Sequence, residues 1–105
     1  MTEGVDVVLA ALADPTRRRL LDALAAHGTA TATVLAADVP VSRQAIVKHL
    51  AVLYQAGLVD HGRRGREVRY SVRSRRLAET AQWMSRLAAD WDKLAATNRI
   101  AEAAD

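Results

Sequence analysis

The sequence predicts a mainly α fold of the α+β class, in which four short helices precede a small β-hairpin and one long helix follows it. Two patterns indicate this fold. Apolar residues recur at helical spacing along most of the chain, but between about residues 58 and 73 they alternate with polar residues, as in strands. A chain of 105 residues fits one domain, so we expect residues 1–105 to form a single domain.

The first two helices are predicted on either side of the dipeptide Asp14-Pro15. The chain before it carries apolar residues on one face of a short helix, at Val5, Val8, Leu9 and Leu12. Asp is a strong N-cap and Pro suits the first helical position, so a second helix begins at this dipeptide. Gly28 ends that helix, and its inward face carries Leu20, Leu21 and Leu24.

A third and a fourth helix are predicted with only a short break between them. Thr31 caps a short third helix, which Val39-Pro40 interrupts. Ser42 caps the fourth helix, which Gly57 ends. The inward residues of the third helix are Leu35 and Ala36, and those of the fourth, spaced i, i+4 and i+7, are Ile46, Leu50 and Leu53.

The hairpin and the long last helix complete the predicted fold. A first strand starts at Leu58, residues 62–66 form the turn, and the second strand alternates apolar with polar residues at Val68, Tyr70 and Val72. Nothing interrupts a helix from about Arg76 to Ala103. Its apolar residues step by seven, three, four and three positions and are Leu77, Met84, Leu87, Trp91 and Leu94.

The third and fourth helices followed by a hairpin predict a winged helix-turn-helix. In this motif the second of the two helices buries one side and exposes short polar or cationic side chains near its N-terminus. Glutamine pairs with adenine, arginine or lysine pairs with guanine, and valine contacts the thymine methyl group. The candidate DNA contacts on this helix are Ser42, Arg43, Gln44, Val47, Lys48 and His49. Two roles stay open for His49, a phosphate contact and packing at the edge of the core.

The positive charge of the chain is concentrated in the same region. The net charge is +3, but residues 43–76 hold nine lysines and arginines and only two acids, which indicates a polyanionic partner. The turn at residues 62–66 is either a hairpin turn that charge keeps soluble or a wing that contacts the DNA backbone or a minor groove. Its position directly after the fourth helix favours the wing. The candidate DNA contacts here are Arg63, Arg64, Arg66 and Arg69.

These segments together resemble the ArsR family of small winged-helix repressors over about residues 7–95. The motifs that carry the resemblance are LADPTRRRLL from Leu12 to Leu21, VSRQAIVKHL from Val41 to Leu50, and RRGREV from Arg63 to Val68. Each motif is weak alone, and the three are specific in this order and spacing. The resemblance implies a symmetric dimer held by the first and last helices, DNA recognition by the fourth helix, and repression of a promoter.

Two departures from the family pattern are visible. Pro40 stands in the turn where the family usually has Gly, which stiffens the turn. The thiolate-rich metal motif of the third helix is absent, because the chain has no cysteine, and residues 76–105 contain no histidine for the alternative metal site on the last helix. We therefore expect neither a metal nor a cofactor.

No set of residues indicates catalysis, so we expect the protein not to be an enzyme. The three histidines, His27, His49 and His61, fall on different elements, and none has a histidine or carboxylate at i+3 or i+4. His27 is most simply a cation near a helix C-terminus. Arg18 is expected to pair with Asp22 rather than to clamp a phosphate.

The first and last helices carry apolar stripes that are larger than a monomer of this size buries. On the last helix two tryptophans belong to the stripe, and a dimer interface is favoured over a ligand pocket. The candidate interface residues are Val5, Leu9, Leu12, Trp83, Leu87, Trp91 and Leu94.

The sequence therefore predicts a bacterial transcription regulator, a homodimeric repressor that binds an inverted-repeat operator in double-stranded DNA. The alternative is a winged-helix protein-interaction module, which would expose an apolar rather than a basic fourth helix. Salt-dependent retention on heparin separates the two. The chain opens on no leader and has no membrane-spanning run, so we expect a cytoplasmic protein. The sequence leaves open whether a small molecule acts as an effector.

Overall fold

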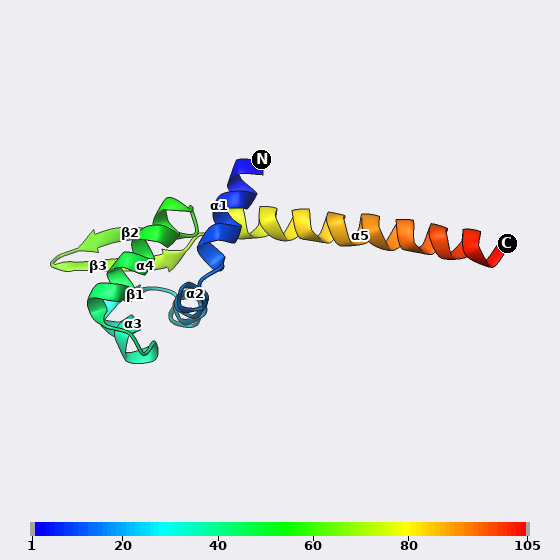
Figure 1. The fold of residues 1–105 in the computed structure, drawn as a ribbon. Coiled ribbons are helices and arrows are strands. Elements are labelled where there is room, and N and C mark those ends of the chain that lie inside the picture. The colour runs from blue at the N-terminus through cyan, green and yellow to red at the C-terminus, as the bar shows by residue number, and fades with distance from the viewer. Residues whose placement is uncertain (1, 105) are drawn as a thin grey trace.

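The structure is a computed structural model that describes residues 2–104, so Met1 and Asp105 of the expected domain lie outside the described residues. Its elements follow the predicted order, with one additional short strand before the third helix. They are α1 (Thr2–Leu12), α2 (Pro15–His27), β1 (Ala30–Thr31), α3 (Ala32–Asp38), α4 (Arg43–Gln55), β2 (Val59–Arg64), β3 (Glu67–Val72) and α5 (Arg75–Ala104). The molecule measures 70 × 26 × 20 Å, because α5 projects far beyond the rest of the chain (Figure 1).

Three helices begin at the capping residues that the sequence predicts. The Asp14 carboxylate accepts hydrogen bonds from the amides of Thr16 and Arg17, at 2.7 and 3.3 Å. The hydroxyl oxygens of Thr31 and Ser42 accept from the first-turn amides of α3 and α4. Because each cap satisfies amides that lack an intrahelical partner, these helix starts are local properties of the sequence.

The sheet has three antiparallel strands in the order β1-β3-β2. The hairpin is confirmed, but its predicted turn is too long, since pairing continues to Arg64 opposite Glu67. Gly65 has a φ of 62° and permits a two-residue turn at residues 65–66, so residues 62–64 remain in β2. The sheet has one strand more than the predicted hairpin, because β1 pairs with β3. A two-residue strand is too short to show a periodicity.

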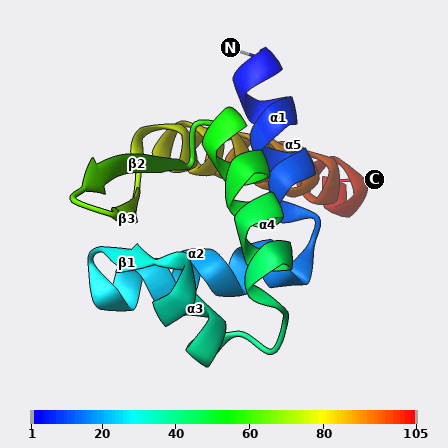
Figure 2. The same ribbon diagram turned by 90° about the vertical axis from the view of Figure 1, so that its left-hand side faces the viewer.

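The core lies where α1–α4 meet the sheet. The inward positions predicted for the fourth helix are confirmed, as Ile46, Leu50 and Leu53 are fully buried. From α1, Val8 and Ala11 join the same core. The other fully buried large side chains are Leu20, Leu24, Leu35, Leu58 and Val59. This packing holds α4 in place with one side in the core and the other in solvent (Figure 2).

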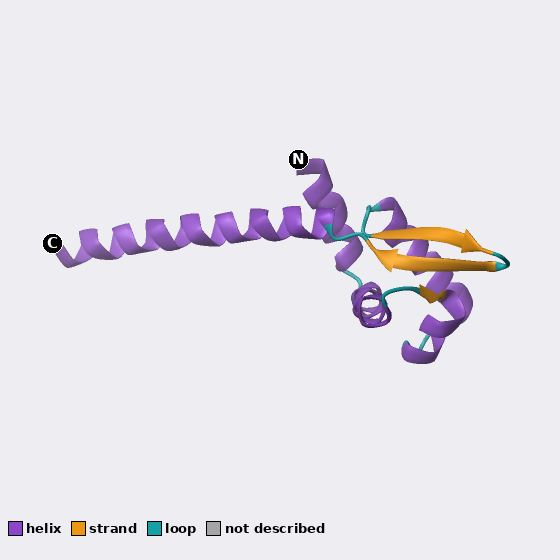
Figure 3. Cartoon of the chain, turned by 180° about the vertical axis from the view of Figure 1, so that it is seen from behind, coloured by secondary structure: helices purple, strands orange, loops and turns teal. Residues whose placement is uncertain are grey.

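The long helix α5 contacts the rest of the chain only near its start. Leu77 packs against the core, and Thr80 is buried, with its hydroxyl donating to the Arg76 carbonyl at 2.8 Å. Every side chain from Ala81 to Leu94 is exposed. Figure 3 shows this helix extending away from the hairpin and the shorter helices. Among the described residues, no helix has the length and apolar character needed to cross a membrane.

Candidate nucleic-acid interface

The solvent side of α4 carries the side chains that the sequence predicts for DNA contact. Gln44, Lys48 and Val47 are exposed, whereas the opposite side of the helix is buried. Figure 2 looks onto this helix, with the hairpin on one side, α1 on the other, and α2 passing behind its lower half. The exposed face offers an amide, an ammonium and an apolar methyl pair, which are groups that recognise base edges in the major groove.

Arg43 and Ser42 lie at the start of α4. Both side chains are exposed, and both also form hydrogen bonds within the chain. The Arg43 Nε donates to the Thr33 hydroxyl of α3 at 3.3 Å, across the turn that joins the two helices. The Ser42 hydroxyl oxygen accepts from the Ala45 amide at 3.1 Å. Both residues therefore help to set the start of α4, a role that the sequence predicted for Ser42 only.

The end of the hairpin is strongly cationic. Arg63 and Arg64 end β2, Arg66 lies in the turn, and all three are exposed. In the described part of the chain, no carboxylate lies within ion-pair distance of these three guanidiniums. Neighbouring residues of a strand point to opposite faces, so Arg63 and Arg64 extend from opposite faces of the hairpin. They are available for an anionic partner on either side.

Arg69 differs from the other predicted wing residues because its guanidinium has partners. It lies 3.2 Å from the Glu67 carboxylate and 3.4 Å from the Thr29 hydroxyl, and its residue is only half-exposed. These contacts join β3 to the loop before β1. The structure therefore gives Arg69 a role in the sheet itself.

An aromatic cluster joins α4 to the hairpin, and sequence reasoning missed it. The rings of Tyr54 and His61 are 4.3 Å apart, and those of His61 and Tyr70 are 5.9 Å apart. His61 stands opposite Tyr70 in the strand register, while Tyr54 comes from the end of α4. The cluster links the orientation of the hairpin to that of the helix.

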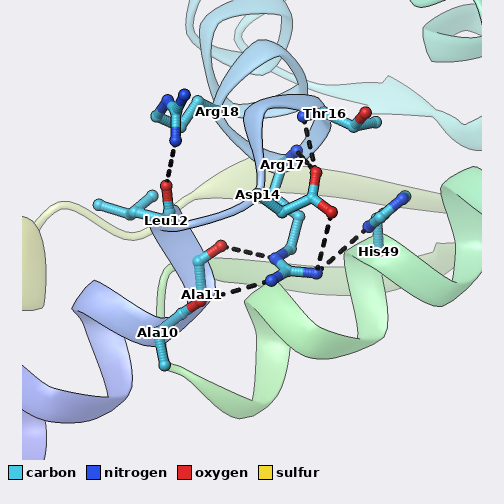
Figure 4. A network of polar contacts seen from close by, with 8 residues as sticks. All are labelled: Ala10, Ala11, Leu12, Asp14, Thr16, Arg17, Arg18 and His49. Atoms are coloured by element: carbon cyan, nitrogen blue, oxygen red, sulfur yellow. Dashed lines mark hydrogen bonds and ion pairs between the residues drawn. The ribbon is translucent and has the colours of Figure 1, made fainter.

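Arg17 and Arg18, at the start of α2, bind backbone carbonyls at the end of α1. Arg18 does not bind the Asp22 carboxylate, which is the partner that the sequence predicts for it. Arg18 donates to the Leu12 carbonyl at 2.5 Å, and no ion pair with Asp22 forms among the described residues (Figure 4). The predicted pair is thus wrong, because unpaired helix-end carbonyls are near and accept well. Arg17 binds the preceding carbonyls and also reaches His49 of α4. His49 is half-exposed.

The remaining histidines lie apart from one another. The His27 Nε2 is 2.7 Å from the Asp38 carboxylate, which ties the end of α2 to the end of α3. The sequence placed His27 correctly near a helix end but did not indicate this partner, which lies eleven residues away. Within the described residues, no group of three or more His, Asp or Glu side chains is arranged to hold a metal ion.

The predicted interface residues are not all equally accessible. Trp83, Leu87, Trp91 and Leu94 of α5 are exposed by 38%, 56%, 65% and 53%, and Leu9 of α1 by 38%. Val5 is half-buried. Leu12 packs against the core of its own chain, so it is the least available of the set. The largest exposed apolar surface is therefore on α5.

Comparisons with known proteins agree with this geometry. A helix-turn-helix domain model matches residues 12–62, from the end of α1 into β2. The transcriptional repressor SdpR from Bacillus subtilis (strain 168) is 36% identical over 77 residues, covering 73% of this chain and 84% of the repressor. An ArsR-like transcriptional regulator from Rhodococcus sp. RHA1 is 42% identical, with a TM-score of 0.80 over 94% of this chain and 93% of that one.

The chain belongs to the ArsR family of transcriptional regulators. A further similar structure, HlyU from Vibrio cholerae N16961, is 26% identical with a TM-score of 0.67, over 82% of this chain and 92% of that one. The present chain has the winged helix-turn-helix fold. It is a transcriptional regulator with a DNA-binding domain rather than an enzyme. The resemblance found in the sequence is thereby confirmed.

Proposed function

We propose that this ArsR family regulator is a homodimeric repressor that binds an inverted-repeat operator in double-stranded DNA. One observation carries the proposal. The solvent side of α4 presents Gln44, Val47 and Lys48, while its other side is locked into the core, and an arginine-rich hairpin lies beside it. A rigid helix with short polar groups and a flanking cationic hairpin matches the major groove and the adjacent DNA backbone.

The two parts of this surface have different tasks. Gln44 and Lys48 contact base edges, and Val47 contacts a thymine methyl group. The wing arginines contact phosphates or enter a narrow minor groove, where the negative potential is enhanced. The full set of proposed DNA contacts is Ser42, Arg43, Gln44, Val47, Lys48, His49, Arg63, Arg64, Arg66 and Arg69.

A second copy of the chain covers the exposed stripe of α5, and an adjacent part of α1 contributes. The proposed interface comprises Val5, Leu9, Leu12, Trp83, Leu87, Trp91 and Leu94. Two-fold symmetry then places two α4 helices on one face of the duplex, which requires an inverted repeat with half-sites about one turn, 10–10.5 base pairs, or a multiple apart. Repression follows from the likeness to a transcriptional repressor. A protein that acts on chromosomal DNA works in the cytoplasm of a bacterium.

Selection from random duplex DNA with the purified chain tests the proposal. We expect enrichment of an inverted repeat, two chains per duplex, and lower expression of a reporter whose promoter carries the selected site. Enrichment of a single half-site, or one chain per duplex, would contradict the dimer. No enrichment together with no salt-dependent retention on heparin would indicate a protein-interaction module instead.

A further inference from the structure

The guanidinium of Arg17 lies at the junction of α1, α2 and α4, with only 17% of its side chain exposed (Figure 4). Its Nε donates to the Ala11 carbonyl at 2.5 Å, and its Nη2 donates to the Ala10 carbonyl at 3.4 Å. Both carbonyls belong to the last turn of α1. The Ala10 carbonyl also accepts from the Ala13 amide at 3.3 Å, whereas the Ala11 carbonyl has no intrahelical partner. A cation at this position also compensates the negative end of the helix dipole. Arg17 therefore caps the C-terminus of α1 from the first turn of α2.

The third nitrogen of the same guanidinium reaches α4. The Arg17 Nη1 is 3.4 Å from the His49 Nδ1 and 3.8 Å from the Asp14 carboxylate. A guanidinium has donors only, so the histidine nitrogen in this contact must be the acceptor. The hydrogen bond network thus places the proton of the neutral ring on Nε2.

The Nε2 of His49 is free to bind a partner outside the chain. In Figure 4 this nitrogen points away from Arg17. Among the described residues no hydrogen-bond partner is found for it, and no buried side-chain nitrogen or oxygen lacks a partner, so it is reachable by solvent. Figure 2 shows α1 on the side of α4 that faces away from the hairpin, and Arg17 links the end of α1 to His49. A donor on this flank of α4 lies where a DNA strand would pass if the helix enters the major groove.

We propose that Arg17 is a positioning residue for DNA binding, because it holds His49 in the tautomer whose Nε2–H donates to a DNA phosphate. This inference rests on the proposed function of α4. It also assigns Arg17 a coupling role, since one guanidinium binds the end of α1 and a side chain of α4 that is thirty-two residues away in sequence. A movement of α1 relative to α4 must break one of these contacts. Because α1 packs against α5, the contact links the proposed dimer helices to the recognition helix.

Lysine cannot replace Arg17 in this role, although it keeps the charge. Its single ammonium cannot reproduce the planar fork that reaches two carbonyls and an imidazole at once. At position 49, asparagine offers a carbonyl oxygen as acceptor and an amide as donor, whereas leucine offers neither. Arg19 is exposed in the same helix turn and forms no hydrogen bond or ion pair among the described residues, so Arg19→Lys is the matched control.

The first experiment reads the tautomer directly and needs no DNA. Long-range proton–nitrogen NMR spectra of the ¹⁵N-histidine-labelled protein, recorded where the imidazole is neutral, distinguish a ring protonated on Nε2 from one protonated on Nδ1. We expect the Nε2–H form for His49 in the wild type and in Arg19→Lys, and a mixture of both forms in Arg17→Lys. An Nδ1–H form in the wild type, or the same spectrum in Arg17→Lys, would overturn the proposal.

The second experiment measures affinity for the selected operator by fluorescence anisotropy. His49→Leu removes the donor and should weaken binding about tenfold, the equivalent of roughly 1.4 kcal/mol. Arg17→Lys should weaken binding less, about twofold if the two tautomers become equally populated, because only the Nε2–H form donates to the phosphate. The double variant should be no weaker than His49→Leu, because both changes act on the same contact. His49→Asn should recover most of the affinity that His49→Leu loses. Additive losses, or equal affinities of the Asn and Leu variants, would overturn the proposal.

The two experiments fail separately. If no operator is selected, the proposed function fails and the phosphate contact with it, while the NMR spectrum still decides whether Arg17 sets the His49 tautomer. Thermal unfolding shows whether each variant is folded at the assay temperature. If Arg17→Lys is unfolded at that temperature, the wild-type NMR spectrum and the operator affinities of His49→Leu and His49→Asn still decide the outcome. These two changes are made at a half-exposed position.

Discussion

At the scale of single residues, the junction of α1 and α2 depends on a few short polar contacts. Asp14 caps the start of α2, while Arg17 and Arg18 cap the end of α1 from the other side of the turn. Burial by itself raises the pKa of Asp14, but hydrogen bonds from the Thr16 and Arg17 amides and the neighbouring positive charge of Arg17 outweigh it. The pKa of Asp14 therefore lies below its ordinary value of 3.8.

The lowered pKa of Asp14 predicts an acid-dependent loss of stability. A carboxyl group whose pKa is lower in the folded state stabilises the fold above its ordinary pKa of 3.8, and this stabilisation is lost as the pH falls through the lower, folded value. Asparagine also caps helices but does not titrate. We expect the free energy of unfolding of Asp14→Asn to fall less than that of the wild type between about pH 5 and pH 2. Urea unfolding at several pH values measures this, and parallel profiles would contradict it.

Gly57 provides a second prediction at the residue scale. It follows α4 with a φ of +76°, and a Cβ placed there would lie 2.9 Å from the Arg76 Cδ. Arg76 also donates to the Ala56 carbonyl at 3.0 Å, so moving its side chain away disturbs this bond. Gly57→Ala should reduce the free energy of unfolding by about 1–2 kcal/mol, the cost of a left-handed conformation in a residue with a side chain. The control Gly62→Ala, whose Cβ would meet nothing within 4 Å, should change it less.

At the scale of elements, α4 and the hairpin behave as one unit. The Tyr54, His61 and Tyr70 rings bridge them, and Val59 and Leu58 anchor the start of β2 in the core. The hairpin therefore leaves the body in a defined direction relative to α4, although its end is exposed. The contact therefore holds α4, which exposes the Gln44 amide, side by side with the hairpin, which exposes guanidinium groups.

This arrangement predicts that base reading and phosphate binding are separable. Gln44→Ala should remove about 1–3 kcal/mol of discrimination among operator variants and leave the salt dependence nearly unchanged. Arg64→Ala should weaken binding to all sequences alike. The slope of log K against log salt is negative, and each lost phosphate contact reduces its magnitude by about 0.9, so the loss of one contact from each of two wings in a dimer reduces it by up to about two.

Salt titrations of both variants on the selected operator and on scrambled DNA make the comparison. Arg86→Ala on α5, remote from the hairpin in sequence and exposed, is the matched control for Arg64→Ala. If Gln44→Ala and Arg64→Ala behave alike, α4 is not the element that reads the bases.

At the scale of the whole molecule, α5 dominates the shape. Its 30 residues extend about 45 Å at 1.5 Å per residue, and only the first turns pack against the body. The exposed Trp83, Leu87 and Trp91 lie on one face, and a face of this kind is rarely left in water. This shape and this exposed face support the proposed dimer.

The proposed dimer predicts that two substitutions to glutamate on α5 have very different effects on dimerisation. Leu87→Glu places a carboxylate in the middle of the stripe, where burial without a partner costs several kcal/mol, so dimerisation should weaken at least about a hundredfold. Ser85→Glu adds the same charge on an exposed position of the opposite face and should leave the dimer intact. Sedimentation equilibrium at micromolar concentration measures both. A monomeric wild-type protein would contradict the proposed interface.

A metal titration tests the whole regulator for family-type metal sensing. The chain has no cysteine, and residues 76–105 have no histidine, so both metal sites of the family lack their ligands. Operator affinity should be the same with micromolar zinc, with arsenite and with a chelator present. Release of the DNA by zinc would show a metal site built from other residues.

The sequence by itself determined where α2, α3 and α4 begin and which face of α4 meets the core. Caps such as Asp14, Thr31 and Ser42 act on amides two or three residues away, and periodicity is a property of neighbouring residues. For the same reason the exposed positions of α4 followed once Ile46 and Leu50 were identified as buried. These features depend on residues that are close together in the chain, so the amino-acid sequence alone specifies them.

Only the tertiary structure decided the contacts between distant elements. The third strand, the Arg17–His49 contact and the ring cluster around His61 join residues that packing brings together, and no local pattern specifies their partners. A side chain such as Arg17 has several competing acceptors, among them the carboxylate of Asp14 and the carbonyls at the end of α1. Which of these it binds depends on where the core places α1 and α4 relative to α2, because hydrogen bonds form only at short range.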